Sequence, residues 1–150
     1  MRTLTSTLAA LTFFFILVFM SCKKDAGTGP PPTNITGAID PALTTGTWRI
    51  GFFSHNSEDQ TTNYTAYKFQ FSETGNVTVT NNDVSYNGSW MGSDDNSQLK
   101  LNLNFMSNSP LDLLSHDWTV FQQTSTQINL RYVNGKDNTD FLTLNKNLVK

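Results

Sequence analysis

Three adjacent residues have the types found in a hydrolytic triad: Ser115, His116 and Asp117. Such a triad works because the histidine takes the serine proton while the carboxylate orients the histidine ring. Neighbouring side chains on an extended strand point to opposite faces, so three consecutive residues do not meet in this way. The serine of the stretch 88–92 also stands in the wrong place for a Gly-x-Ser-x-Gly elbow. We therefore predict no catalytic residue and no enzyme.

The residue types that bind metal ions are few and poorly spaced. His55 and His116 are the only histidines, and neither belongs to a His-x-His or His-Glu-x-x-His pattern. Both are expected in loops or at strand ends. Asp94, Asp95 and Asn96 carry oxygens that suit calcium, but the later glutamate of an EF-hand is absent. Because Asp, Asn and Ser favour turns, we predict a solvated turn there, and neither a metal ion nor another cofactor.

Cys22 is the only cysteine, so an internal disulfide is excluded. It follows an apolar run of 13 residues, Leu8–Met20, which is broken only by Thr12 and preceded by the positive charge of Arg2. This length is typical of a signal-peptide core, whereas a membrane-spanning helix needs about 20 apolar residues. Residues 1–21 are therefore predicted to be a signal peptide. A short uncleaved membrane anchor is the alternative.

The sequence Phe19-Met20-Ser21-Cys22 resembles the lipobox of bacterial lipoproteins, in which a small residue precedes a cysteine that receives the lipid. The resemblance implies that Cys22 becomes the lipidated N-terminus and that the chain contacts the membrane through this lipid. Two or more acyl chains anchor a protein stably, whereas one does so only marginally. The resemblance also implies the bacterial cell envelope, with the outer membrane as the expected location.

The part that follows the signal peptide is weakly acidic and begins with a tether. Residues 22–150 contain 9 Lys plus Arg and 12 Asp plus Glu, a net charge of −3 (9 − 12). No basic patch is visible, so nucleic acid is not expected as a partner. Residues 22–42 are rich in proline and glycine and offer little to bury, which predicts a disordered tether. The folded domain is predicted to span residues 43–150.

From Thr47 onward, apolar and polar residues alternate with a period of two, as in strands with one buried face. Glu73–Asn76 and Asn81–Asp83 predict tight hairpin turns. Longer loops are expected at Gly92–Ser97 and Asn134–Asn138, and a short helical turn or an extra strand at Pro110–Ser115. The eight alternating runs are Thr47–Phe52, Tyr67–Phe71, Asn76–Thr80, Asp83–Trp90, Leu99–Phe105, Trp118–Val120, Ile128–Tyr132 and Leu142–Leu144.

Eight short strands predict an all-β fold, an antiparallel barrel or sandwich. Gly46-Thr47-Trp48 at the head of the first run resembles the Gly-x-Trp motif of lipocalins, and Gly88-Ser89-Trp90 repeats it. The domain thus resembles the bacterial lipocalin-like lipoproteins, which implies an eight-stranded up-and-down barrel with Trp48 across its closed end. The family's arginine that covers this tryptophan has no clear counterpart here.

Alternation assigns one set of side chains to the interior. These are Trp48, Ile50, Phe52, Tyr67, Phe69, Phe71, Val84, Tyr86, Trp90, Leu99, Leu101, Leu103, Phe105, Trp118, Val120, Ile128, Leu130 and Tyr132. No charged residue is among them, so any ligand inside would be a small apolar molecule. The candidates for its lining are Trp48, Ile50, Phe69, Phe71, Tyr86, Trp90, Leu101, Leu103, Trp118, Leu130 and Tyr132.

Two functions follow from this pattern. The first is a lipid-anchored barrel that binds a small apolar molecule. The second is a filled barrel whose loops contact another envelope protein, as an interaction or inhibitor module. Bulky side chains compete for the narrow interior of an eight-stranded barrel, so the size of any cavity discriminates between the two.

Overall fold

The structure is a computed structural model that describes residues 39–135 and 138–148. The predicted signal peptide, Cys22 and all of the predicted tether before Ile39 lie outside the described residues. In the described part, no helix is both long and apolar enough to cross a membrane.

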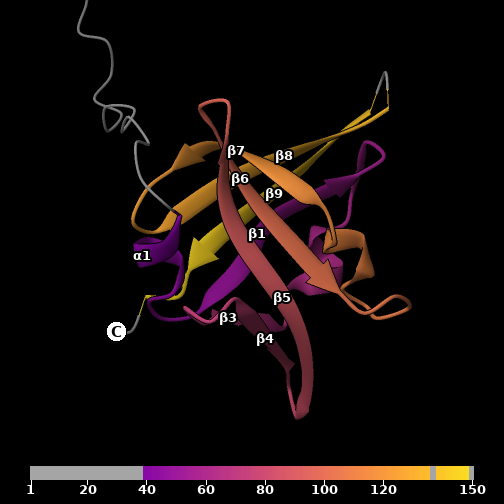
Figure 1. Cartoon of the computed structure of the whole chain (residues 1–150). Helices are drawn as coiled ribbons and strands as arrows, with labels where there is room; N and C mark the ends of the chain where they lie inside the picture. Colours follow the sequence, from indigo (N-terminus) through magenta and orange to yellow (C-terminus); the bar gives the residue numbers. More distant parts are fainter. Residues whose placement is uncertain (1–38, 136–137, 149–150) are drawn as a thin grey trace, which may run out of the picture.

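One antiparallel sheet makes up the fold (Figure 1). Its order is β2-β1-β3-β4-β5-β6-β7-β8-β9, and β1 pairs a second time with β9. This second pairing closes β1 and β3 to β9 into an eight-stranded barrel, with β2 as a short addition beside β1. The strands are β1 (Trp48–His55), β2 (Glu58–Asp59), β3 (Tyr67–Phe71), β4 (Asn76–Asn81), β5 (Val84–Asp95), β6 (Gln98–Phe105), β7 (Asp117–Gln123), β8 (Gln127–Asn134) and β9 (Asn138–Lys146).

The predicted eight-stranded up-and-down barrel of the lipocalin-like type is therefore confirmed. Each of the eight alternating runs lies within one of its strands or begins one residue before it, and the predicted turns at Glu73–Asn76 and Asn81–Asp83 join neighbouring strands. The period of two is the reason: it gives every strand one apolar face, and closing the sheet buries all of these faces together without leaving an open edge.

Two residues assigned to the interior are exposed instead. Phe52 is 39% exposed because a β-bulge between Ile50 and Phe52 shifts the register, so Phe53 points inward in its place. Gly51 permits this bulge, since a Cβ atom there would collide with the side-chain amide of Asn145. Val84 is 52% exposed because it pairs with Asn81 at the tip of the β4–β5 hairpin, next to the turn.

The predicted loop at Gly92–Ser97 is also wrong in its extent. β5 continues to Asp95, and only Asn96 and Ser97 turn the chain into β6. Both residues have positive φ angles, 52° and 67°, as the two-residue turn of a twisted hairpin requires. The Asp94-Asp95-Asn96 segment is thus the end of a strand and the start of a turn, and Asn96 donates a hydrogen bond to Asp95.

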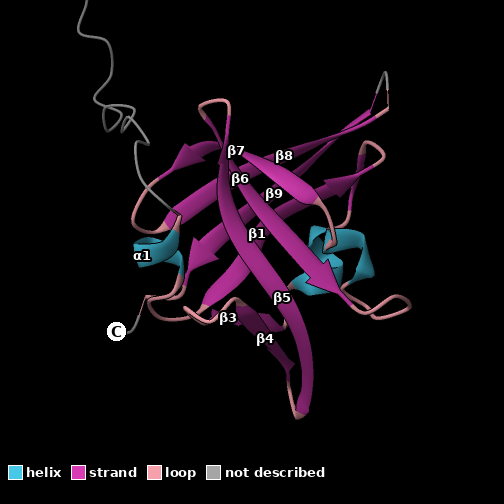
Figure 2. Cartoon of the chain, in the orientation of Figure 1, coloured by secondary structure: helices cyan, strands magenta, loops and turns pink. Residues whose placement is uncertain are grey.

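Short helical segments lie at two opposite sides of the barrel (Figure 2). One side carries α1 (Asp40–Leu43), and the other carries the 3₁₀ helices η1 (Thr61–Tyr64) and η2 (Asp112–Leu114). The helical turn predicted within Pro110–Ser115 is confirmed by η2. The predicted domain boundary at Leu43 needs correction, because Ile39 is already fully buried and the packed part therefore begins before α1.

Candidate functional site

The eleven candidate lining residues all point into the barrel. Nine of them are buried, while Tyr86 and Tyr132 are partly buried and pack against the same core. The core they belong to also includes Phe53, Val77, Ile128 and Leu144. The structure thus brings the predicted set together in one cluster, and each member has other members of the cluster as neighbours.

Aromatic rings fill much of this interior. Phe71 meets Trp90 edge to face with ring centroids 5.8 Å apart, and Phe53 meets Trp118 in the same manner at 6.4 Å. Trp118 in turn lies 6.1 Å from Tyr132. Such edge-to-face contacts are favourable and leave little room between the rings. Among the candidate lining residues, Phe71 thus contacts Trp90, and Trp118 contacts Tyr132, inside the barrel.

One end of the barrel, here called the α1 end, is closed by residues 39–43. Ile39 and Leu43 are fully buried, and Trp48 donates from Nε1 to the carbonyl of Leu43 at 2.9 Å. Lys146 covers the Trp48 ring with its Nζ 5.4 Å from the ring centroid and donates to the carbonyl of Ala42 at 3.3 Å. Lys146 therefore occupies the covering position for which the sequence offered no clear candidate.

The opposite end, here called the histidine end, is closed by η1 and η2. Tyr64, Leu111 and Leu114 are buried there, and Trp118 donates from Nε1 to the carbonyl of Leu114 at 2.9 Å. The Tyr64 hydroxyl donates to the carbonyl of Pro110 at 3.1 Å, which joins the two helical segments. Burial raises the pKa of Tyr64, with a further contribution from Tyr67, so this hydroxyl keeps its proton.

A buried carboxylate lies beside this closure. Asp140 is fully buried; its Oδ2 lies 2.9 Å from Nδ1 of His55, and its Oδ1 accepts a hydrogen bond from the backbone N–H of Asn56 at 2.9 Å. The Asn56 side-chain amide lies 2.9 Å from the other ring nitrogen of His55, an arrangement that suits a ring protonated on Nδ1. Both ring nitrogens of His55 are therefore occupied, which leaves no nitrogen free to act as a base.

His116 lies at the same end, directly before the first residue of β7. Its ring stacks on Tyr132 with centroids 4.1 Å apart and an angle of 9° between the planes. Its Nε2 is buried and has no hydrogen-bond partner among the described residues. Burial lowers the pKa of His116, against the opposing effect of the Asp140 carboxylate. The ring is thus held neutral between aromatic side chains.

The Ser115-His116-Asp117 sequence does not assemble a triad. Ser115 accepts a hydrogen bond from the backbone N–H of Phe105 at 3.0 Å, and Asp117 lies at the surface, 3.7 Å from Lys100. The three side chains thus have separate partners, because Ser115 caps the C-terminal end of η2, His116 lies between η2 and β7, and Asp117 begins β7. In the described part of the chain, no group of three or more His, Cys, Asp or Glu side chains is placed to hold a metal ion.

The outer surface has a hollow of about 890 Å³ next to β5. Its walls come from α1 and the residue after it, from the β3–β4 turn, and from β5 and β6. The lining residues are Pro41, Thr44, Glu73, Thr74, Gly75, Ser89, Trp90, Met91, Gly92 and Asn102. Of the candidate lining residues of the interior, only Trp90 reaches this hollow. The hollow is thus outside the barrel, and a smaller one of about 310 Å³ lies beside Gly88 and Phe105.

Comparison with known proteins adds no relative to this picture: no protein-family model, no curated protein and no solved structure matches the chain.

Sequence reasoning missed Asp140, the partner of His55. Its signal was present, because Asp140, Leu142 and Leu144 stand at alternate positions of β9 and all three are buried. Extending the eighth run by two residues would have placed a carboxylate on the inner face. His55 and His116 do lie at strand ends or next to them, as predicted.

Proposed function

We propose that this chain is an exported lipoprotein of the bacterial cell envelope and that its filled barrel binds an envelope protein through its outer surface. The observation that carries the proposal is the state of the interior. Aromatic and aliphatic side chains occupy it, and short helical segments with buried apolar residues close both ends. Protein interiors packed in this way have few voids larger than a water molecule.

The same observation argues against an internal ligand. An apolar molecule inside would need to displace rings such as Trp118 and Phe71, each of which already has an edge-to-face partner. It would also need to pass the α1 segment or the pair η1 and η2. Displacing several buried large side chains costs more than a small apolar ligand returns, since each is worth about 1.5–3 kcal/mol of burial.

The anchor in this proposal is a lipid on Cys22, which holds the barrel at the outer membrane. The support is the Ser21-Cys22 pair after an apolar run of 13 residues. The net charge of −3 for residues 22–150 (9 − 12) supports a protein partner over nucleic acid. The occupied nitrogens of His55 support a role without catalysis.

Lipidation is tested by metabolic labelling with a radioactive fatty acid in cells that express the chain. The wild type is expected to take up the label, and Cys22→Ala is expected to lose it and to accumulate as the unprocessed precursor. Equal labelling of both proteins would remove the anchor from the proposal.

The filled interior is tested with a hydrophobic fluorescent probe and a series of fatty acids. We expect no saturable binding to the wild-type chain. In parallel, a photo-reactive amino acid placed at exposed positions such as Met91 is expected to crosslink to envelope proteins in living cells, while the buried Leu101 position gives none. Saturable one-to-one binding of an apolar probe, with no crosslink from any exposed position, would overturn the proposal in favour of an internal ligand.

A further inference from the structure

β5 is longer than the strand beside it, and this leaves part of one edge without a partner. β4 pairs with β5 only as far as Ser89, opposite Asn76. Beyond that point β5 continues to Asp95 and pairs with β6 alone. Among the described residues, no strand lies against the other edge of β5 from Met91 to Asp95.

The backbone groups on this edge are oriented for another strand. Trp90 donates its backbone N–H to the carbonyl of Gly75 at 2.8 Å, so Trp90 faces the β4 side. Alternate residues of an antiparallel strand present their N–H and C=O groups to the same side. Gly92 and Asp94 therefore present both groups to the unpaired side, while Met91, Ser93 and Asp95 bond to β6.

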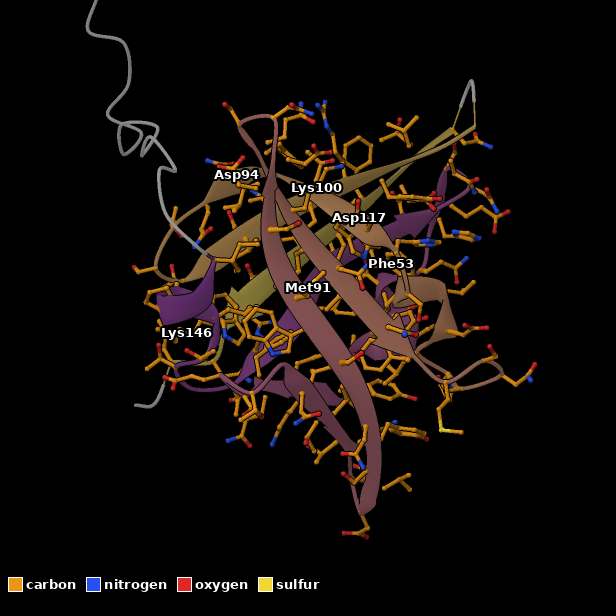
Figure 3. The ribbon with its side chains drawn as sticks, viewed as in Figure 1. Phe53, Met91, Asp94, Lys100, Asp117 and Lys146 are labelled. Atoms are coloured by element: carbon orange, nitrogen blue, oxygen red, sulfur yellow. The ribbon has the colours of Figure 1, made fainter. Side chains whose placement is uncertain are left out.

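The hollow described above lies at the start of this edge. The bond from Trp90 to Gly75 is the last backbone bond between β5 and the β3–β4 turn. Trp90, Met91 and Gly92 form the β5 wall of the hollow. Met91 is 62% exposed, so its apolar side chain is accessible at the wall of the hollow. Figure 3 shows Met91 and Asp94 along β5, with Lys100 and Asp117 on the neighbouring strands. An added strand would thus find both backbone partners and apolar contacts.

The charges around the edge are negative. Glu73 lines the hollow, and Asp94 and Asp95 lie exposed on β5. No Lys or Arg is among the described residues that line the hollow. Lys100, which pairs with Ser93, points away to Thr119 at 2.9 Å and to Asp117 at 3.7 Å. Acids on an edge oppose pairing with a second acidic copy and favour a basic segment.

We propose that the free edge of β5, Met91–Asp95, accepts an extended basic segment of a partner protein by strand addition. This inference rests on the proposed function and names the surface and the chemistry of the partner. The backbone of the segment bonds to Gly92 and Asp94. Apolar side chains on one face of the segment contact Met91 in the hollow, and lysines or arginines on its other face meet Asp94, with Glu73 adding to the negative charge around the edge. Backbone bonds supply affinity in this recognition mode, and the side chains supply selectivity.

The probe for the test is a blocked octapeptide of alternating lysine and valine, titrated against the purified full-length lipoprotein. The control peptide alternates glutamate and valine. We expect saturable one-to-one binding of the lysine peptide only, together with slower amide hydrogen exchange at Gly92 and Asp94. The variant Asp94→Lys with Glu73→Lys should weaken binding by about tenfold or more, since close charge pairs are worth at least that factor. Asp83→Lys, at the opposite tip of β5, is the matched control and should leave affinity unchanged.

A second variant tests the backbone directly. Gly92→Pro removes the N–H that faces the free edge and spares the bonds to β6, so the peptide should no longer slow amide exchange at Asp94, while the barrel still unfolds cooperatively. If Gly92→Pro does not fold, the charge variants and the exchange pattern decide alone. Equal binding of both peptides, or protection elsewhere than β5, would overturn the inference.

Two other occupants have their own signatures, and either one overturns the inference. Protection of Gly92 and Asp94 that grows with protein concentration without peptide indicates a second copy. Protection without peptide that disappears when residues 23–38 are replaced by a Gly-Ser chain indicates the protein's own tether. If crosslinks to envelope proteins arise in cells from other exposed positions only, the proposed function stands and this inference fails.

Discussion

The two ends of the barrel use one closing contact in two chemical settings. At each end a tryptophan Nε1 donates to a carbonyl of a short helical segment at 2.9 Å, Trp48 to Leu43 and Trp118 to Leu114. At the α1 end this bond is surrounded by buried Ile39 and Leu43 and covered by Lys146. At the histidine end the neighbours include the buried carboxylate of Asp140 and the rings of His55 and His116.

The comparison shows that the same tryptophan–carbonyl bond closes both ends, whereas only one end is expected to change its stability with pH. The closing residues Ile39 and Leu43 at the α1 end are apolar, so their burial depends little on pH. At the histidine end, burial lowers the pKa of His116, so the stability of this end follows the protonation of that ring. Four predictions break or sharpen this comparison, in order of decreasing effect.

Removing the tryptophan of the α1 end should have the largest effect. Trp48→Ala is expected to lower the free energy of unfolding by about 3–5 kcal/mol, because it empties a fully buried site and leaves the Leu43 carbonyl unpaired. Urea unfolding followed by circular dichroism measures it on the chain from residue 23. Phe141→Ala, at a 40% exposed ring on the outer face, is the control and should cost far less. A loss below about 1 kcal/mol for Trp48→Ala would show that this end does not depend on the tryptophan.

The buried carboxylate should come next. Asp140→Ala leaves His55 and the Asn56 N–H without their partner and is expected to cost about 1–3 kcal/mol in unfolding free energy. Asp140→Asn keeps the shape and one acceptor, so its cost should be smaller. The exposed Asp83→Ala serves as the surface control, expected within about 0.5 kcal/mol of the wild type. Equal stability of Asp140→Ala and Asp83→Ala would contradict the role given to Asp140.

Lys146 should contribute less than either. Its ammonium group lies over the Trp48 ring, and such contacts are worth about 0.5–1 kcal/mol at partly exposed sites. Lys146→Ala should therefore lower stability by roughly this amount, and Lys146→Arg should retain it because the charge and its reach remain. A larger loss in Lys146→Arg than in Lys146→Ala would show that the covering contact is not cationic in nature.

The smallest effect concerns pH at the histidine end. Burial lowers the pKa of His116 in the folded state, and nearby His55 lowers it further, whereas the carboxylates of Asp140 and Asp112 act to raise it. Below the ordinary value of about 6.5 the unfolded chain then binds more protons than the fold. The stability from His116 is therefore complete above that pH and is lost as the pH falls from it towards the folded pKa. His116→Phe keeps a ring against Tyr132 and should flatten the stability profile in this window. An unchanged profile would assign the pH dependence to other groups.

The barrel itself was predictable because the alternation of apolar and polar residues within each strand indicates which face is buried. The strand around Leu99, Leu101 and Leu103 needs no other part of the chain to be assigned. The bulge at Gly51 was not predictable from alternation, because Phe52 and Phe53 are both aromatic and either could point inward. A bulge inserts one extra residue into a strand, and the alternation of residue types in the sequence does not reveal where this happens.

The closures at the ends were harder to predict, since they depend on contacts between distant segments. His55 and Asp140 are 85 positions apart, and neither has a neighbour in sequence that indicates the other. α1 holds Pro41, which reads as tether, yet proline is well tolerated in the first turn of a helix. Lys146 reads as the polar end of a strand, and its contact with Trp48 exists only because β9 pairs with β1.

The α1 closure also has a mechanical consequence if the anchor and a partner pull on the chain from opposite sides. Tension that enters from the membrane side reaches Ile39 first and passes through α1 before it loads β1. The Trp48–Leu43 bond and the Lys146–Ala42 bond then carry the force as a clasp, and their rupture would release only the short segment 39–43. Behind this clasp, β1 is held along its length by β9, from Trp48 opposite Lys146 to Ser54 opposite Phe141. Load along β1 would therefore be shared among the bonds of this pairing.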